Sequence, residues 1–444
     1  MANDLQSTAL PIDWERTTLG EIVRRAGGRI QTGPFGSQLH ASDYVDVGIP
    51  SIMPVNIGDG RIVANGIARI SKDDAERLSR HRVAAGDIVY SRRGDVERHA
   101  LIEPEQAGWL CGTGCIKVNL GRGVVVPRFA SFVLRHPFTR EWITRHAVGA
   151  TMPNLNTSIV SEIPFILPPL ETQRRIAHIL GTLDDKIELN RRMNRTLEGM
   201  AAAIFKSWFI DFDPVRAKAE GRAPALPKHL ADLFPNTFQD SPLGPIPEGW
   251  EAGTLGDVSE NPRRSIKPEE VPPATPYIGL QDMPRRCIAL DTWGRADEVG
   301  SQKSRFNTGE ILFGKLRPYF HKVGIAPVDG VCSTDILVIV PKSEHWRSYV
   351  LSLVSSKEFV DYTDSHSAGT KMPRTNWKDM SRYPLAIPPV DVVQAFQELV
   401  GDFHRRIPLN VCQNRRLAAL RDTLLPKLLS GEIDESVLEQ IEVP

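Results

Sequence analysis

Residues 170–208 read LETQRRIAHILGTLDDKIELNRRMNRTLEGMAAAIFKSW, and their apolar positions step alternately by four and three residues. This heptad spacing predicts one long amphipathic helix. At 1.5 Å per residue the helix is roughly 58 Å long, well beyond a typical globular helix, so it needs a partner along its length. The seam positions are Ile176, Leu180, Leu183, Ile187, Asn190, Asn194, Leu197, Ala201, Ile204 and Trp208.

The same pattern returns 220 residues later, in the stretch VDVVQAFQELVGDFHRRIPLNVCQNRRLAALRDTLLPKL at 390–428. Asparagine in an apolar seam lowers stability but fixes register. We therefore expect an antiparallel helix pair in which Asn190 lies near Asn414 and Asn194 near Asn410, all four as register-setting residues. A helix packed only on its own domain is the alternative. The second seam comprises Phe396, Val400, Phe403, Ile407, Asn410, Asn414, Leu417, Arg421, Leu424 and Leu428.

The repeat extends beyond the helices, so the chain consists of two copies of one sequence unit. The second copy is 16 residues shorter before its Met-Pro signature, because Trp14 to Gly149 spans 135 residues and Trp250 to Gly369 spans 119. The matching segments are Trp14-Glu15 with Trp250-Glu251, Thr18-Leu19-Gly20 with Thr254-Leu255-Gly256, Gly86 to Tyr90 with Gly309 to Phe313, Cys111 with Cys332, and Gly149, Met152-Pro153 and Asn156 with Gly369, Met372-Pro373 and Asn376.

The parts before the helices have short apolar stretches bounded by Gly and Pro, together with helix-like stretches such as Phe129 to Trp142. They predict mixed α/β (α+β) domains. Because each globular part precedes its helix, an antiparallel pair would hold the two parts apart about a pseudo-two-fold axis. The expected divisions are a first globular domain at 12–168, a central spacer helix at 169–210, a linker at 211–247 with a short helix around 226–234, a second globular domain at 248–388, a distal spacer helix at 389–430 and an acidic tail at 431–444.

The composition limits which binding partners and which cellular compartment are expected. The 444 residues hold 54 Lys plus Arg and 54 Asp plus Glu, so the formal net charge is zero and any nucleic-acid surface must be local. No apolar run reaches the roughly 20 residues that span a bilayer, and the start lacks a signal-peptide pattern. We expect a cytoplasmic protein without a membrane partner. Its five cysteines are few and scattered, which predicts reduced thiols.

Catalytic and metal motifs are missing from the sequence: it has no GxxxxGK[ST], no HExxH and no paired CxxC. Cys111 and Cys115 are interpreted as packing or turn residues, and Asp184-Asp185-Lys186 as a solvated helix face and not a nuclease cluster. Asp213-Pro214-Val215 and Asn261-Pro262-Arg263 do not fit the adenine-binding motif of DNA methyltransferases. This pattern favours a binding protein.

Cations follow the same predicted strand in both copies. Ile88 to Tyr90 leads into Arg92 and Arg93, and the matching strand leads into Lys315 and Arg317. Such side chains suit phosphate contacts or bidentate reading of guanine. Lys371 and Arg374, which flank Met372-Pro373, are further candidate phosphate donors. Ordinary exposed cations are the alternative.

The chain resembles the specificity subunit of Type I restriction-modification enzymes over essentially its whole length. In the second copy Arg374 and Thr375 replace Asn154 and Leu155. This difference argues against one shared role for these positions in the two copies. The resemblance rests on Gly149 to Asn156, on Pro168-Pro169-Leu170-Glu171-Thr172-Gln173, on Ile187-Glu188-Leu189-Asn190, on Ser207 to Val215, on Ile246-Pro247-Glu248-Gly249-Trp250 and on Leu424 to Ile433.

This resemblance implies two target-recognition domains, at 12–168 and 248–388, that each read half of a bipartite double-stranded DNA target. It also implies that catalysis lies in partner subunits: methyltransferase (modification) subunits that use S-adenosylmethionine on adenine, and restriction/translocase subunits that use ATP and Mg. This chain would be non-catalytic and hold no cofactor or metal.

An early loop of the first domain is similar to one in many recognition domains of this family, which makes Gly33, Phe35 and Ser37 candidate DNA contacts, with the glycine allowing close backbone approach. A structural turn is the alternative. Two other functions are open: a self-contained DNA methyltransferase or nuclease with an unrecognised active site, and a coiled-coil scaffold without DNA specificity.

Overall fold

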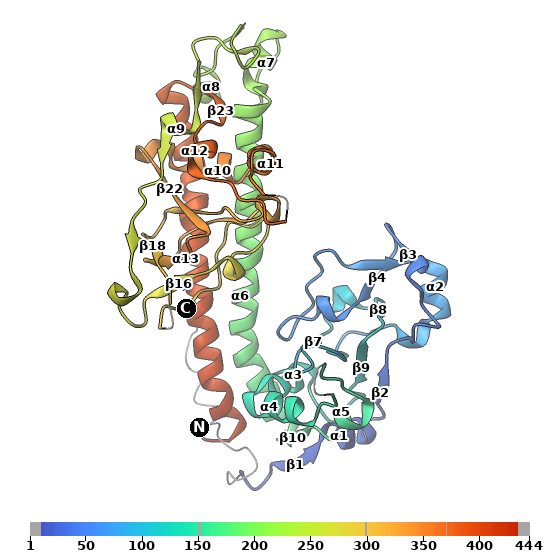
Figure 1. Cartoon of the computed structure of the whole chain (residues 1–444). Helices are drawn as coiled ribbons and strands as arrows, with labels where there is room; N and C mark the ends of the chain where they lie inside the picture. Colours follow the sequence, from blue (N-terminus) through green and yellow to red (C-terminus); the bar gives the residue numbers. More distant parts are fainter. Residues whose placement is uncertain (1–9, 150–151, 298–299, 370, 434–444) are drawn as a thin grey trace. The chain divides into compact units, whose positions relative to one another are not determined.

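The computed structural model describes residues 10–149, 152–297, 300–369 and 371–433 (Figure 1). The chain forms two compact units. Unit 1 contains residues 1–185 and 418–444, and unit 2 contains residues 186–417. Each unit includes a part of both long helices, α6 (Leu170–Phe205) and α13 (Val390–Leu429). Most of the expected acidic tail, residues 434–444, lies outside the described residues.

Unit 1 is a mixed α/β domain, as the sequence predicts. Its two four-stranded sheets have the orders β2-β9-β6-β7 and β3-β5-β4-β8, and β1 pairs with β10. The strands and helices are β1 (Glu15–Thr18), α1 (Leu19–Arg25), β2 (Arg29–Thr32), β3 (Tyr44–Val45), β4 (Ile49–Ile52), β5 (Ala68–Ile70), α2 (Lys72–Arg77), β6 (Ile88–Ser91), β7 (His99–Leu101), β8 (Leu110–Cys111), β9 (Cys115–Asn119), α3 (Pro127–Arg135), α4 (Pro137–His146), α5 (Thr157–Ser161) and β10 (Pro164–Leu167).

Unit 2 repeats this architecture. Its sheets have the orders β14-β22-β19-β20 and β15-β18-β21-β16-β17, while β11 pairs with β12 and β13 with β23. The elements are α7 (Asp213–Ala219), α8 (Lys228–Ala231), β11 (Phe238–Gln239), β12 (Ile246–Pro247), β13 (Glu251–Thr254), α9 (Leu255–Val258), β14 (Ser259–Glu260), β15 (Ser265–Ile266), β16 (Pro276–Ile278), β17 (Gly294–Arg295), β18 (Lys303–Phe306), β19 (Ile311–Gly314), β20 (Val323–Ile325), β21 (Gly330–Cys332), β22 (Ile336–Pro341), α10 (Arg347–Val354), α11 (Lys357–Ser365), α12 (Trp377–Met380) and β23 (Pro384–Ile387).

The matching cysteines of the repeat occupy the same place in both units. Cys111 pairs with Ile52 where β8 runs parallel to β4, and Cys332 pairs with Ile278 where β21 runs parallel to β16. Burial raises the pKa of each of these two thiols to about 12, so both stay protonated and pack as small apolar side chains. Among the described residues no group of three or more His, Cys, Asp or Glu could hold a metal ion.

Within unit 2 the two long helices run antiparallel and carry the expected asparagine contacts (Figure 1). The Nδ2 of Asn190 donates to the Oδ1 of Asn414 at 2.9 Å, and the Nδ2 of Asn410 donates to the Oδ1 of Asn194 at 2.8 Å. All four side chains are buried. The amides therefore hydrogen-bond to one another inside an apolar seam. Their role in setting the register of the two helices remains our prediction.

Within unit 1 a carboxylate ties the same helices to the globular domain. Asp184 accepts from Arg135 of α3 at 2.6 Å and from Arg421 of α13 at 2.7 Å. The expected solvated face over 184–186 is therefore wrong at Asp184, whose side chain is only 25% exposed. Asp185 is different, because its side chain is 66% exposed beside Arg128. The error arose because a sequence window does not show which distant cations face a helix.

Two proline effects depart from the sequence pattern. The helix-like stretch from Phe129 to Trp142 is two helices, α3 and α4, because Pro137 begins the second one and disfavours helical backbone at the residue before it. In contrast, α13 continues through Pro408 although that residue has no N–H to donate to the His404 carbonyl. Packing of the seam around it, with Ile407 and Val411 buried, holds the helix together.

Aromatic side chains form the core where α6 ends in unit 2. The helix passes into a π-helical turn at Lys206–Ile210, which places Phe209 against Phe396 and Tyr349, with ring centroids 5.0 Å and 4.9 Å apart. The short helix expected around 226–234 is α8. No helix in the part of the chain that the structure describes is long and apolar enough to cross a membrane.

Candidate nucleic-acid interface

The Met-Pro signature forms the same tight loop in each unit. In unit 1, Val148 and Asn154 exchange both backbone hydrogen bonds, at 3.0 and 2.9 Å. Gly149 has a φ of 112°, and a Cβ there would lie 2.7 Å from the Met152 carbonyl oxygen, so only glycine fits. We call residues 148–154 hairpin 1, of which 150–151 lie outside the described residues.

In unit 2 the equivalent pair is Ala368 and Arg374, which exchange hydrogen bonds at 3.0 and 2.9 Å. Gly369 has a φ of 98°. We call residues 368–374 hairpin 2, without residue 370. The repeated glycine and Met-Pro pair thus encode a repeated backbone shape.

Each hairpin lies against the cationic end of a central strand. In unit 1 the Leu155 N–H donates to the Arg92 carbonyl at 2.9 Å. In unit 2 the Thr375 N–H donates to the Lys315 carbonyl at 3.0 Å, and the Arg317 N–H donates to the Pro373 carbonyl at 2.7 Å. Two sequence signals that lie about 60 residues apart therefore meet at one surface in both units.

In unit 1 the two candidate arginines differ in their surroundings. Arg92 is half-buried, and its Nε lies 3.3 Å from both the Asn154 Oδ1 and the Leu155 carbonyl oxygen. It therefore holds hairpin 1 with one edge of its guanidinium. Arg93 is exposed and is the more available cation for a phosphate.

The early loop joins the same surface through the turn between β8 and β9. The Gly33 N–H donates to the Cys115 carbonyl at 2.9 Å, and the Arg92 N–H donates to the Gly114 carbonyl at 2.8 Å. Gly33 is buried, and a Cβ there would lie 2.1 Å from the Gly112 carbonyl oxygen. Gly33 thus has a structural role, whereas Phe35 is 56% exposed and Ser37 is exposed.

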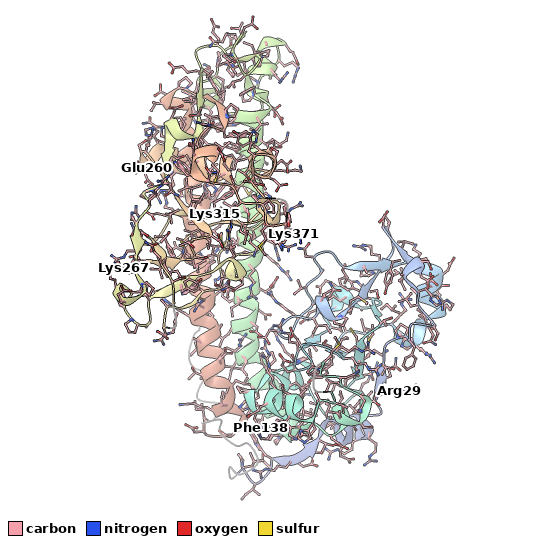
Figure 2. All side chains as sticks on the ribbon, viewed as in Figure 1. Arg29, Phe138, Glu260, Lys267, Lys315 and Lys371 are labelled. Carbon is pink, nitrogen blue, oxygen red and sulfur yellow. The ribbon has the colours of Figure 1, made fainter. Side chains whose placement is uncertain are left out.

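In unit 2 two candidate cations, Lys371 and Arg374, belong to hairpin 2, and Lys315 and Arg317 lie next to it. Lys315 and Lys371 are labelled in Figure 2. Lys371 and Arg374 are exposed, although an oxygen of Asp335 lies 3.4 Å from Arg374. Arg317 has a φ of 52°, and its buried Nε has no hydrogen-bond partner. A residue held in this left-handed region is strained, and such strain is often found at binding sites.

A cationic hollow that the sequence did not predict lies beside Lys315. This hollow of about 470 Å³ is also lined by Arg263, Arg264 and Trp377. Arg264 pairs with Glu310 at 2.8 Å, while Arg263 follows β14 in a left-handed turn, with a φ of 47°. In the sequence, the only sign of this hollow is the pair of adjacent arginines that follows a short strand.

A hollow of about 440 Å³ lies at a similar place in unit 1. It is lined by Arg24, Arg29 and Ser158 among others, and Arg29 is labelled in Figure 2. Both hollows combine arginines with hydroxyl or amide side chains, which is the chemistry that contacts phosphates and base edges.

Comparison with known proteins adds to this geometry. A family model described as the Type I restriction modification DNA specificity domain matches residues 11–199 and 247–405. The chain belongs to this family. The two matched ranges fall on the two copies of the sequence repeat, so each copy is one specificity domain.

Curated relatives of this family match nearly end to end. The HindI specificity subunit of Haemophilus influenzae, a Type I restriction enzyme subunit, is 25% identical over 95% of this chain and 100% of the relative. The MjaIX specificity subunit of Methanocaldococcus jannaschii is 25% identical over 96% and 94%. A crystal structure of a Type I restriction-modification system S subunit from M. genitalium shares the fold, with a TM-score of 0.54, 16% identity, and coverage of 94% and 96%.

The two specificity domains present different side chains on one backbone design. Asn154 and Arg374 form the same bridge in their hairpins, and Arg92 and Lys315 accept the same backbone hydrogen bond. Arg93 is replaced by Leu316. A common scaffold with exchanged polar side chains is the arrangement expected of two readers with different targets.

Proposed function

We propose that this chain is the DNA-recognition subunit of a Type I restriction-modification complex, in which units 1 and 2 each read one half of a bipartite sequence. One observation carries this proposal: the same hairpin and cationic strand end occur in both units, with different side chains at matching positions. The family membership supports it.

Charge and geometry support contact with double-stranded DNA. In unit 1 the exposed Phe35, Ser37 and Arg93 belong to segments bonded to the same turn or hairpin, and in unit 2 Lys315, Arg317, Lys371 and Arg374 gather around hairpin 2. Cations hold the DNA backbone, while planar and bidentate side chains read base edges. A local surplus of positive charge at these surfaces is compatible with a net charge of zero for the whole chain.

Catalysis in this proposal belongs to the partners. Methyltransferase subunits would bring S-adenosylmethionine, and restriction/translocase subunits would bring ATP and Mg²⁺. The alternative is a self-contained methyltransferase or nuclease. The test supplies radiolabelled S-adenosylmethionine and genomic DNA to this chain alone, to the methyltransferase subunits alone and to both together. We expect sequence-specific methylation from the mixture only; methylation or cleavage by the isolated chain contradicts the proposal.

We propose further that α6 and α13 set the distance between the two half-sites. A heptad inserted into both helices preserves the seam and adds about 10 Å, or roughly 3 base pairs, at 1.5 Å per residue. The unread spacer should lengthen by that amount while both half-sites stay the same. Altered half-sites with an unchanged spacer contradict the role of the helices as a ruler.

A further inference from the structure

Hairpins 1 and 2 each expose a methionine at the same position. Met152 is 61% exposed and Met372 is 58% exposed. The backbone carbonyl of each methionine lies close to the positive-φ glycine three residues earlier. A Cβ added to Gly149 would lie 2.7 Å from the Met152 carbonyl oxygen, and one added to Gly369 would lie 3.3 Å from the Met372 carbonyl oxygen. The backbone packs inward while the side chain remains in solvent, in both units.

The surroundings of these methionines are cationic. Lys371 precedes Met372, and the exposed Arg374 follows Pro373. In unit 1 the Gly94 N–H donates to the Pro153 carbonyl at 3.3 Å, which brings the segment that carries Arg93 next to Met152. An exposed apolar side chain with cations nearby suits a polyanion that also has an apolar interior, and duplex DNA is such a partner.

The internal repeat distinguishes residues that differ between the two units from residues that are identical in both. Side chains that read different half-sites should differ between the units, as Asn154 and Arg374 do. The methionine, the following proline and the turn glycine are instead identical. Identical residues in both halves suit a task that does not depend on base sequence.

We propose that Met152 and Met372 are wedges that insert into the minor groove and partly unstack one base step in each half-site. Methionine is among the apolar side chains that kink DNA in this way, and the kink brings more of the protein surface onto the duplex. This inference rests on the proposed function. It assigns a DNA-deforming role to two residues that carry no charge and make no base-specific hydrogen bond.

The test measures DNA bending by the assembled methyltransferase complex. The probe is a duplex of about 40 base pairs that carries the methylated motif of this system, with a fluorescent donor and acceptor at its ends. Variants Met152→Ala and Met372→Ala remove the wedges singly and together, while Met152→Leu and Met372→Leu keep an apolar side chain. Met200→Ala on α6, where Met200 is 45% exposed, is the matched control.

We expect each alanine variant to lose part of the bend and the double variant to lose most of it. Affinity should fall about tenfold per site on target and non-target duplexes alike, because the contacts that the kink brings onto the protein surface are lost. The leucine variants and Met200→Ala should behave as the original chain does.

Three results separate the possibilities. An unchanged bend in the double alanine variant overturns the wedge while leaving the proposed function intact. A variant that no longer assembles with the methyltransferase subunits also overturns it, since the methionines would then contact protein. If the original complex shows no sequence preference at all, the proposed function itself fails, and the wedge fails with it.

Discussion

The side-chain amide of Asn190 donates to the Oδ1 of Asn414, 224 residues further along the chain, at 2.9 Å. The Asn190 amide is also 2.9 Å from the Oε1 of Gln413. Asn190 and Asn414 are 1% and 7% exposed, so water does not replace this bond when one partner is lost. We predict that this polar contact inside an apolar seam fixes the two helices in a single alignment.

Asn190→Ala should therefore destabilise unit 2 by about 1–3 kcal/mol, the typical cost of leaving a buried polar group without a partner. Thermal denaturation measures the loss. Replacing both residues by leucine should recover most of it, because the partners disappear together. A single variant as stable as the original chain would show that the amides do not support the pairing.

Asp184→Ala should destabilise unit 1, because it removes the carboxylate that Arg135 and Arg421 share and leaves Arg421 with the more exposed Asp422. The side chains of Arg135 and Arg421 are 7% and 13% exposed. We expect a loss of about 2 kcal/mol or more, below the values for fully buried pairs because Asp184 retains some exposure. Asp185→Ala is the adjacent control: its exposed pair with Arg128 should contribute under about 1 kcal/mol. Equal effects of the two variants would contradict the ion cluster as a structural element.

Glu198 of α6 makes unit 2 sensitive to pH. Burial raises the pKa of its carboxyl group to about 7, and its Oε1 accepts from the Ile288 N–H at 2.8 Å in a small hollow also lined by Arg286, Cys287, His321 and Lys357. The folded pKa lies above the ordinary value of 4.5, so the folded state holds the proton more tightly. The contribution of the protonated Glu198 to the free energy of unfolding is therefore fully present below about pH 4.5, and it is lost as the pH rises to about 7.

Glu198→Gln keeps the acceptor and removes the charge. The variant's melting temperature should exceed that of the original chain by about 2–4 °C at pH 8, and the difference should shrink as the pH falls toward 5. Melting curves at several pH values provide the measurement. A difference that is constant across this range would exclude ionisation of Glu198 as its cause.

Arg93→Ala should weaken DNA binding by the assembled complex in a salt-dependent way. A lost phosphate contact lowers the slope of log affinity against log salt by about 1 and affects all sequences equally. Lys228→Ala, whose side chain is 89% exposed on α8, is a control that should leave the slope unchanged. If Arg93→Ala leaves the slope as it was, Arg93 is not a phosphate contact; a changed sequence preference would make it a base reader.

The fixed spacing of seam residues such as Ile187 and Ile407 was sufficient to predict the long helices, and the repeated asparagines predicted their antiparallel pairing. The segments repeated outside the helices predicted the duplicated α/β domains. The break at Pro137 follows from the local backbone preference of proline, which the apolar pattern does not show. The persistence of α13 through Pro408 depends instead on packing that outweighs local preference. The meeting of Arg92 with Asn154 is a tertiary contact that spacing alone does not contain. The hollow around Arg263 and the ion cluster at Asp184 went unpredicted for the same reason.

Sequencing the methylated adenines in cells that contain the intact system shows whether one chain carries two readers of a split DNA target. We expect one bipartite motif whose two short half-sites are separated by unread base pairs, and this motif should disappear when the chain is deleted. A continuous motif, or adenine methylation that persists unchanged without the chain, would contradict this expectation.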